Sequence, residues 1–385
     1  MSAPRAPSSE ELQFELISDL PALERFASAW RELGAEAVCT ELMQGPDWLL
    51  TWWRHYGARR TLACGVFRHR GLAVGFAPMC RRWYRYRMGL AFRRLELLGS
   101  GFDESDGVCS DYLGIAARRG FESAVSAAFA RHLADGSFGA VDECLLEGID
   151  ASDPMASHLR ADLSNGPLAF AETVQAKALY IKLPDCWETY EQSVRKKSRK
   201  FLRTAMRDFE LWTGAGGYRL HRAIDAATLE AGRRALTSLH GARWRKSNST
   251  GVFAASRFSN FHRDFAQKAL ATDALELLWL TVNDEPVAAI YCFVGSNKVY
   301  FYQSGRKVGV PPKVRLGIVM MVLAIQQAIA QKRTEFDFLA GDDRYKRLFA
   351  TESRQLISFR VARKSAKETV RRILTATVAS AKGRL

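Results

Sequence analysis

Side chains able to do chemistry gather in residues 336–349 of this 385-residue chain. A short apolar run containing Asp337 predicts a buried strand, and a capped helix is expected after it over 342–350. Polar groups that meet where a strand gives way to a helix mark a favoured site in α/β folds. The alternative is a capped helix with a surface Tyr–Lys pair. The candidate residues here are Asp337, Asp342, Tyr345 and Lys346.

Asp337 points away from its two Phe neighbours if side chains alternate along the strand 336–339. That orientation fits a carboxylate in a cleft, and it fits a buried salt bridge equally well.

A strongly basic run covers 195–207, where seven of thirteen residues are Lys or Arg, among them Arg199 and Arg203. The spacing predicts a helix that packs its apolar side and shows a positive face. That face is either simply solvated or binds an anionic sugar nucleotide, a lipid-linked pyrophosphate or tRNA.

A second polar cluster consists of His240, Arg243 and Trp244, just after a predicted helix. No Ser or Cys near His240 stands in a nucleophile-elbow pattern. We therefore expect substrate binding or packing here, and no covalent catalysis.

Charge is the unusual property of the composition: 56 Lys and Arg against 41 Asp and Glu give +15. Such a balance implies an anionic partner. The seven Cys are scattered without C-x-x-C spacing, which predicts reduced thiols and no metal site. No segment has the length and apolarity of a membrane span or the pattern of a secretory signal, so a cytoplasmic protein is expected.

The order of predicted elements repeats. Three strands, a helix and two further strands come first, at 61–67, 72–79, 94–98, 121–133, 141–147 and 178–183. Helices are expected at 187–212, 225–239 and 257–270. The first pattern then returns at 275–282, 286–294, 298–303, 314–331, 336–339, 342–350 and 356–361. Two copies of one α/β unit are therefore predicted.

Five stretches resemble the CelD-like branch of the GNAT acyltransferase superfamily, whose relatives include the Fem-type transferases of peptidoglycan cross-bridges. The stretches are 46–57, 74–78, 198–203, 240–244 and 336–346. The resemblance implies an α/β fold of two tandem GNAT-like mixed sheets flanked by helices, with a basic helical insertion between them. It divides the chain into 12–184 (first copy, degenerate), 185–272 (insertion and lead-in helices), 273–363 (second core) and 364–385 (basic tail).

The resemblance also implies where an acyl donor binds, because a GNAT fold places the CoA pyrophosphate at the start of the helix after the fourth strand. The matching loop departs from the usual pattern at Pro311, which offers no N–H donor. The donor-binding residues expected in this loop are Arg306, Lys307, Gly309, Arg315 and Gly317. A solvated basic loop is the alternative.

By the same resemblance, Tyr345 is a general acid for the leaving thiolate, and Asp337 or Glu276 accepts the proton of the acceptor. Acceptor binding falls to Arg199, Arg203, His240, Arg243, Trp244, Asp342 and Lys346.

The expected activity is transfer of an acetyl or other acyl group from acyl-CoA, without a metal, to an amine or hydroxyl on a saccharide, sugar-nucleotide or lipid-linked acceptor of the cell envelope. A Fem-type transferase that uses aminoacyl-tRNA is one rival, and a non-catalytic module that docks on an anionic saccharide or a synthase is another. The basic tail 364–385 reads as an amphipathic helix that either packs on the protein or lies on the inner membrane surface.

Overall fold

The computed structural model describes residues 8–38, 41–86, 89–100, 106–214, 217–245 and 250–382. The chain forms two compact units that do not follow its order. Unit 1 consists of residues 1–102, 108–175 and 355–385, and unit 2 of residues 103–107 and 176–354.

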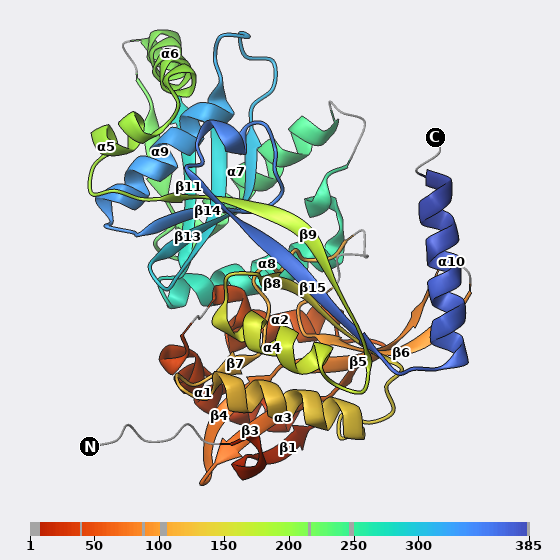
Figure 1. The fold of residues 1–385 in the computed structure, drawn as a ribbon. Helices are drawn as coiled ribbons and strands as arrows, with labels where there is room; N and C mark the ends of the chain where they lie inside the picture. The colour runs from red at the N-terminus through yellow and green to blue at the C-terminus, as the bar shows by residue number, and fades with distance from the viewer. Residues whose placement is uncertain are drawn as a thin grey trace. The chain divides into compact units, whose positions relative to one another are not determined.

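Unit 2 contains a mixed sheet with the strand order β10–β11–β12–β13–β14–β9 (Figure 1). The strands are β9 (Ala169–Lys182, of which 176–182 belong to this unit), β10 (Arg219–Arg222), β11 (Leu275–Val282), β12 (Glu285–Gly295), β13 (Lys298–Arg306) and β14 (Glu335–Ala340). Neighbours pair antiparallel except β13 and β14, which run parallel. The parallel pair needs a crossover, and helix α9 (Leu316–Ala330) supplies it.

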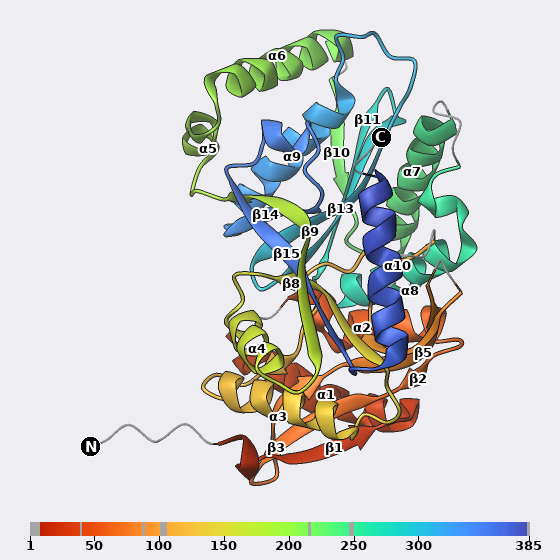
Figure 2. The same cartoon turned by 45° about the vertical axis from the view of Figure 1, so that its right-hand side comes forward.

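Different helices cover the two faces of this sheet (Figure 2). Leu278 and Leu280 of β11 share a core with α9 and with α6. The alternate residues Leu277 and Trp279 lie against Gly232 of α7. Because side chains alternate across a strand, α7 and α9 lie on opposite faces. The remaining helical segments of the unit are α5 (Trp187–Ser193), α6 (Lys196–Thr213), α7 (Ala226–Arg245), η4 (Val252–Ala254), α8 (Ser256–Ala271) and η5 (Lys346–Leu348).

Unit 1 repeats part of this pairing pattern, but its strands β1, β3, β4 and β7 form a separate antiparallel sheet. The strands are β1 (Gln13–Ile17), β2 (Thr61–Leu62), β3 (Cys64–His69), β4 (Leu72–Ala77), β5 (Met79–Arg85), β6 (Ala91–Leu97), β7 (Ala116–Ala117), β8 (Glu143–Asp150) and β15 (Glu352–Ala362, of which 355–362 belong to this unit). The antiparallel pairs β1–β3, β3–β4, β2–β5 and β5–β6 are followed by the parallel pair β6–β8 and the antiparallel pair β8–β15. Its helical segments are η1 (Ser9–Glu11), α1 (Leu20–Glu36), η2 (Leu42–Gln44), α2 (Pro46–Tyr56), α3 (Glu122–Asp135), α4 (Pro154–Ser164) and α10 (Ala366–Lys382).

The predicted fold class of two tandem mixed sheets with a basic helical segment between them is therefore confirmed. The structure adds an exchange of last strands. The end of β9, which follows the first copy along the chain, pairs with β14 of unit 2, and most of β15 pairs with β8 of unit 1.

Three local predictions were wrong. The strand expected at 72–79 is broken at Pro78, which cannot donate to a ladder, and continues as β5. The helix expected at 187–212 is interrupted where Val194 is extended. The helix expected at 342–350 is only the short turn η5, because Gly341 has φ +110° and the chain leaves β14 in a turn.

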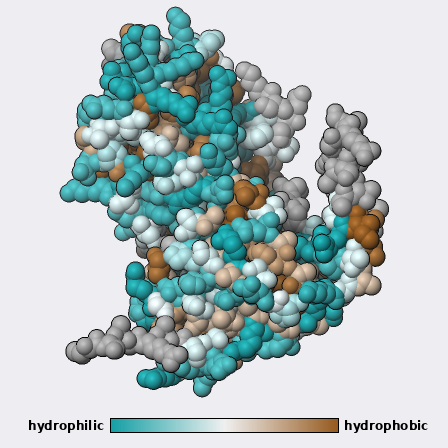
Figure 3. All heavy atoms as spheres, in the orientation of Figure 1, coloured by the Kyte–Doolittle hydropathy of each residue, from teal (hydrophilic) through white to brown (hydrophobic). Residues whose placement is uncertain are grey.

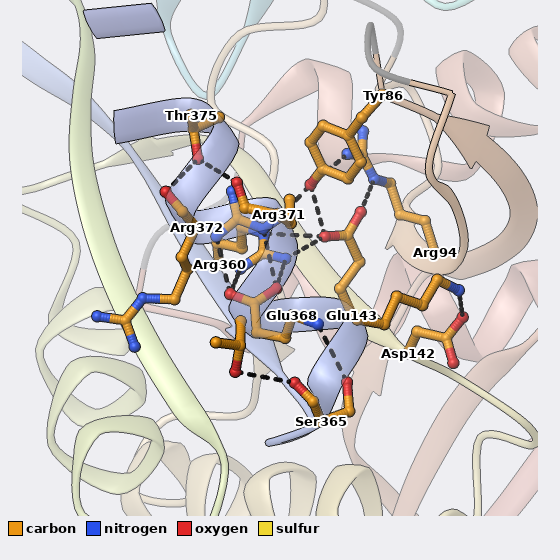
Figure 4. A network of polar contacts seen from close by, with 12 residues as sticks. Tyr86, Arg94, Asp142, Glu143, Arg360, Ser365, Glu368, Arg371, Arg372 and Thr375 are labelled. Atoms are coloured by element: carbon orange, nitrogen blue, oxygen red, sulfur yellow. Dashed lines mark hydrogen bonds and ion pairs between the residues drawn. The ribbon is translucent and has the colours of Figure 1, made fainter. Parts of the chain in front are cut away.

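An ionic network attaches α10 to unit 1 (Figure 4). Glu368, in the first turn of α10, accepts hydrogen bonds from Arg360 of β15 and from Arg371. Arg360 also donates to the fully buried Glu143, which accepts from Arg94 as well. These contacts hold the pKa of Glu368 at about 2 against the penalty of burial. Farther along the helix, Ile373 is 60% exposed, so the described part of α10 is held mainly at its first turn.

Replacement of Glu368 by Gln should destabilise unit 1. The substitution removes the carboxylate partner of Arg371 and one of the two carboxylates that Arg360 pairs with, since Glu143 remains. Breaking a buried ion pair costs about 3–5 kcal/mol, and we expect the low end of that range here. Because the folded pKa of Glu368 is depressed, its stabilisation is present above its ordinary pKa and lost as the pH falls toward about 2. Urea denaturation at pH 7 should therefore separate E368Q from the wild type, and the difference should shrink in acid. The exposed Glu352→Gln serves as control, and an equal loss in both variants would contradict the role of the network.

Replacement of Gly305 by Ala should disturb the contact between β13 and α7. A Cβ at Gly305 would lie 2.6 Å from the backbone N of His240 and 2.9 Å from the carbonyl of Leu236, so the helix must move. Overpacking of this kind costs about 1–3 kcal/mol. Gly166→Ala is the control, because its Cβ would meet nothing closer than 3.4 Å. Thermal denaturation that shifts equally for both variants would show that this close approach does not matter.

Candidate functional site

The parallel strands β13 and β14 separate soon after they meet. They pair only over residues 298–300 and 335–337. Beyond Tyr300, β13 continues to Arg306, and no described strand pairs with it on that side. One backbone edge of β13 is thus free of sheet pairing beside the diverging β14. A strand edge of this kind can accept an extended ligand as an additional strand.

A bulge in β13 lies at the start of this opening. Phe301 pairs with Cys292 and Gln303 with Tyr291, so Tyr302 has no counterpart on β12. The extra residue changes which way the later side chains face. Gly305 consequently lies against α7, whereas the side chain of Arg306 turns toward α9.

A second bulge lies in β14. Between the pairs Asp337–Tyr180 and Ala340–Ala178, two residues of β14 face the single residue Leu179. Leu339 takes φ +58° there, a conformation that is unfavourable for a leucine. Both strands that border the opening therefore depart from regular pairing at the same end of the sheet.

Two of the predicted site residues hold this second bulge in place. The fully buried Asp337 accepts a hydrogen bond of 2.6 Å from the backbone N of Leu339, and Arg354 lies 4.0 Å from its carboxylate. The buried Lys346 donates from Nζ to the carbonyl of Ala340 at 2.6 Å. Both side chains point into the protein interior. For Asp337 this arrangement fits the buried salt bridge and not a carboxylate in a cleft.

Tyr345 lies at the opening itself. Its ring stands edge-on to Phe301 of β13, with centroids 6.5 Å apart, and the residue is 39% exposed. Burial of the phenol, and next the charge of Asp343, raise the pKa of Tyr345 to about 12, while Arg243 acts in the other direction. The hydroxyl therefore stays protonated at every physiological pH and is available as a proton donor.

Arg306 and Arg243 supply positive charge beside Tyr345. The Arg306 side chain crosses the first turn of α9, where a Cβ on Gly317 would lie 3.5 Å from its Cδ. Burial, and next the charge of Arg243, lower the pKa of Arg306, so the two guanidinium groups are close enough to repel each other. Among the described residues neither is paired with a carboxylate. Two cations held together without an anion at a helix start favour a bound phosphate.

His240 and Trp244 complete the α7 side of this site. The indole Nε1 of Trp244 donates to Nε2 of His240 at 2.8 Å, which leaves the proton of the neutral imidazole on Nδ1. Burial, and next the charge of Arg243, lower the pKa of His240 to about 4. His240 is therefore neutral at pH 7, and its Nε2 is already occupied. His240 thus positions Trp244. Because its Nε2 accepts this hydrogen bond, that ring nitrogen is not free to act as a general base.

Two further cations of the predicted donor loop form ion pairs. Lys307 pairs with Glu285, and Arg315 pairs with Asp208 of α6 and stacks on Phe201. Two glycines also belong to the prediction. Gly309 has φ +81°, and Gly317 leaves room for Arg306.

Two other predicted residues, Glu276 and Asp342, lie apart from this group or are paired. Glu276 is bound by Arg222 and by Gln331, which follows the end of α9. The basic loop lies at the start of the same helix, about 22 Å away at 1.5 Å per residue. Asp342 forms a two-point exposed pair with Arg347.

Arg199 and Arg203 lie on α6. Arg203 pairs with Glu191 of α5, and Arg199 donates to the carbonyl of Gln192. Both lie on the exposed face of α6, where they border an open hollow of about 600 Å³ together with Lys196, Lys200, Thr204 and Arg207.

The corresponding place in unit 1 is filled by side chains. There β6 pairs with β5 in regular register, without the bulge of β13. After β6, a Cβ on Gly99 would lie 3.0 Å from Leu49 and 3.1 Å from Leu113. The buried Trp48 donates to Ser110 at 2.9 Å. Apolar packing thus takes the space that Tyr345 and Arg306 border in unit 2.

Sequence reasoning missed Phe301, Tyr302 and Leu339, which shape the opening through the backbone. Nothing in the residue types signals a bulge at these positions. The repeated element order could have pointed to β13 as the strand that matters.

The geometry agrees with comparisons to known proteins. Residues 196–347 match the family described as the acetyltransferase (GNAT) domain. No curated protein matches the sequence. The structure of FemX is similar in fold, with a TM-score of 0.55 and 9% identity over 89% of this chain and 96% of that one.

Two further solved structures are similar over nearly the whole chain. A conserved protein of unknown function from Bacteroides thetaiotaomicron has a TM-score of 0.54 and 10% identity, over 91% of this chain and 100% of that one. The C-terminal domain of an Agrobacterium fabrum lysylphosphatidylglycerol synthetase candidate has a TM-score of 0.51 and 9% identity, over 92% and 96%. At such identities the likeness shows a shared fold. Unit 2 therefore carries the acetyltransferase-like region, and the fold of the whole chain recurs in these proteins.

Proposed function

We propose that unit 2 transfers an acyl group from acyl-CoA to an amine or hydroxyl. The observation that carries this proposal is the opening between β13 and β14, with its unpaired strand edge and with Arg306 at the start of α9. A pantetheine arm has amides that can pair with a strand edge, and the CoA phosphates match a helix start with cations. The match of residues 196–347 to the GNAT domain supports the same chemistry.

In the reaction that we propose, the thioester carbonyl lies against the edge of β13 that faces the diverging β14, where backbone N–H groups of that edge polarise it. The acceptor attacks the carbonyl carbon, and the carbon–sulfur bond breaks. Tyr345 gives its proton to the departing thiolate and is reprotonated by the proton that the acceptor releases, through water. Asp337 and Glu276 stay outside this scheme, because both are buried in ion pairs.

The acceptor that we propose is a saccharide or a phosphate-linked saccharide of the cell envelope, by resemblance to the CelD-like branch. Unit 1, whose equivalent space is packed, serves as a scaffold in this proposal.

The donor is tested by calorimetric titration with acetyl-CoA. Arg306→Gln should weaken binding at least tenfold, because Arg306 lies at the α9 start and pairs with no carboxylate among the described residues. Arg263→Gln removes an equal charge from α8, where the only carboxylate near it is Asp264 at 3.6 Å in the described chain, and should change affinity less than twofold. Equal affinities for wild type and R306Q would remove Arg306 from the donor site.

A thermal-shift series distinguishes the rival functions. Stabilisation by acetyl-CoA supports the proposal. Stabilisation by charged tRNA alone would replace the donor with a Fem-type one, and stabilisation by neither would leave a docking module.

The role of Tyr345 is tested by turnover as a function of pH. Tyr345→Phe should lower kcat by about 100-fold while changing acceptor KM little, because a proton donor acts in the transition state. With the pKa of Tyr345 near 12, its contribution should be constant from pH 7 to 10 and decline only above that range. Tyr218→Phe is a matched control, since Tyr218 is also 39% exposed. Wild-type turnover in Y345F at every pH would refute the general-acid role.

A further inference from the structure

The exposed face of α6 carries an unbroken row of cations. Lys196, Arg199, Lys200, Arg203 and Arg207 follow one another at steps of three or four residues or less, which places them along one side of the helix. The opposite side packs into the core through Leu202, Ala205 and Phe209. The cationic row extends about 16 Å along the helix axis and cannot turn inward. We call these five residues the α6 row.

The α6 row is only partly neutralised by the protein. Glu191 pairs with Arg203, and Asp208 pairs with Arg207 while also holding Arg315 of the donor loop. No carboxylate pairs with Lys196, Arg199 or Lys200 in the described chain. By contrast, Glu230 lies one turn before Arg233 and Arg234 on α7 and pairs with both.

Like charges one turn apart destabilise a helix. Five cations in a row with so few carboxylate partners therefore lower the stability of α6 in the isolated protein. An external anion that meets several cations at once would remove this repulsion. Figure 3 shows the hydrophilic surface over α6, whose position Figures 1 and 2 give.

The exposed side chain of Leu211 favours a lipid membrane over a nucleic acid as the polyanion that binds the α6 row. It lies one turn after Arg207 on the same side of α6 and is 75% exposed. A nucleic acid backbone would leave this aliphatic side chain in water. The boundary between lipid headgroups and acyl chains would take up Leu211 while the phosphates meet the cations.

We propose that the α6 row together with Leu211 is a docking surface for an anionic phospholipid membrane. Asp208 connects the row to Arg315, so a docked membrane lies beside the loop at the start of α9. This inference does not depend on the reaction in unit 2, and it differs from the expectation that the tail 364–385 is the membrane anchor.

Co-sedimentation of the full chain with vesicles tests the docking surface. Binding should occur to phosphatidylcholine vesicles that contain phosphatidylglycerol, be absent with phosphatidylcholine alone, and weaken as salt rises. The triple variant K196Q/R199Q/K200Q should bind at least tenfold more weakly than wild type. The variant L211S should reduce the binding that remains at high salt about threefold.

Two control variants keep the test decisive. R234Q/R263Q/K332Q removes the same charge from other exposed positions of unit 2 and should bind within threefold of wild type. V370S/I373S removes exposed apolar side chains of α10 and should likewise bind as wild type. Equal binding by wild type and the α6 triple variant, or loss only in V370S/I373S, would overturn the proposal.

A binding assay with transfer RNA tests whether the α6 row is a nucleic acid surface instead. Salt-sensitive binding to transfer RNA that the α6 triple variant loses, without binding to the acidic vesicles, would overturn the lipid assignment and make the α6 row a nucleic acid surface. Acetyl-CoA titrations of the same variants report independently on the donor site, so failure of docking and failure of the proposed reaction are distinguishable.

Discussion

The separation of β13 from β14 is the constraint on which the rest of the site depends. Two parallel strands that stayed paired would leave no edge for a ligand, and their side chains would fill a core, as those around Trp48 and Leu49 do in unit 1. The bulge at Tyr302 and the strained backbone at Leu339 keep the strands apart. Asp337 and Lys346 stabilise this strained backbone, since each forms a hydrogen bond with the backbone at or beside Leu339. The two most prominent polar residues of the 336–349 segment thus act on the backbone, and Tyr345 is the one that stands at the opening.

The two units treat their charges differently. In unit 1, Glu143 and Glu368 gather several guanidinium groups into a buried network that holds elements together. In unit 2, Arg243, Arg306, Lys196, Arg199 and Lys200 form no ion pair with a described carboxylate. A protein that buries ion pairs for structure and leaves other cations unpaired concentrates its net charge of +15 where an anion can reach it.

Much of the fold could be predicted from the sequence, because the strands of unit 2 are apolar and bounded by turns and because the order of elements repeats. The roles of His240, Arg243, Trp244, Arg306 and Tyr345 came from the family resemblance and stay predictions. In the structure, Trp244 bonds His240, and the charge of Arg243 acts on His240, Arg306 and Tyr345. The pairing of Glu276 with Arg222 could not be predicted, since it depends on which end of the sheet meets the end of α9. The bulges and the turn after Gly341 were equally out of reach, because they arise from register between distant strands.

The exchange of last strands affects how this chain must be made. Unit 1 takes its final strand from residues 355–362, which leave the ribosome some two hundred residues after β8. The first copy therefore waits with an open sheet edge for almost the whole of synthesis, a state in which unpaired strands invite wrong partners. Unit 2 already has β9 when β14 emerges and can close first. The second copy can thus complete its sheet before the first, although it is translated later. A cut between the two copies would separate each of them from its own last strand.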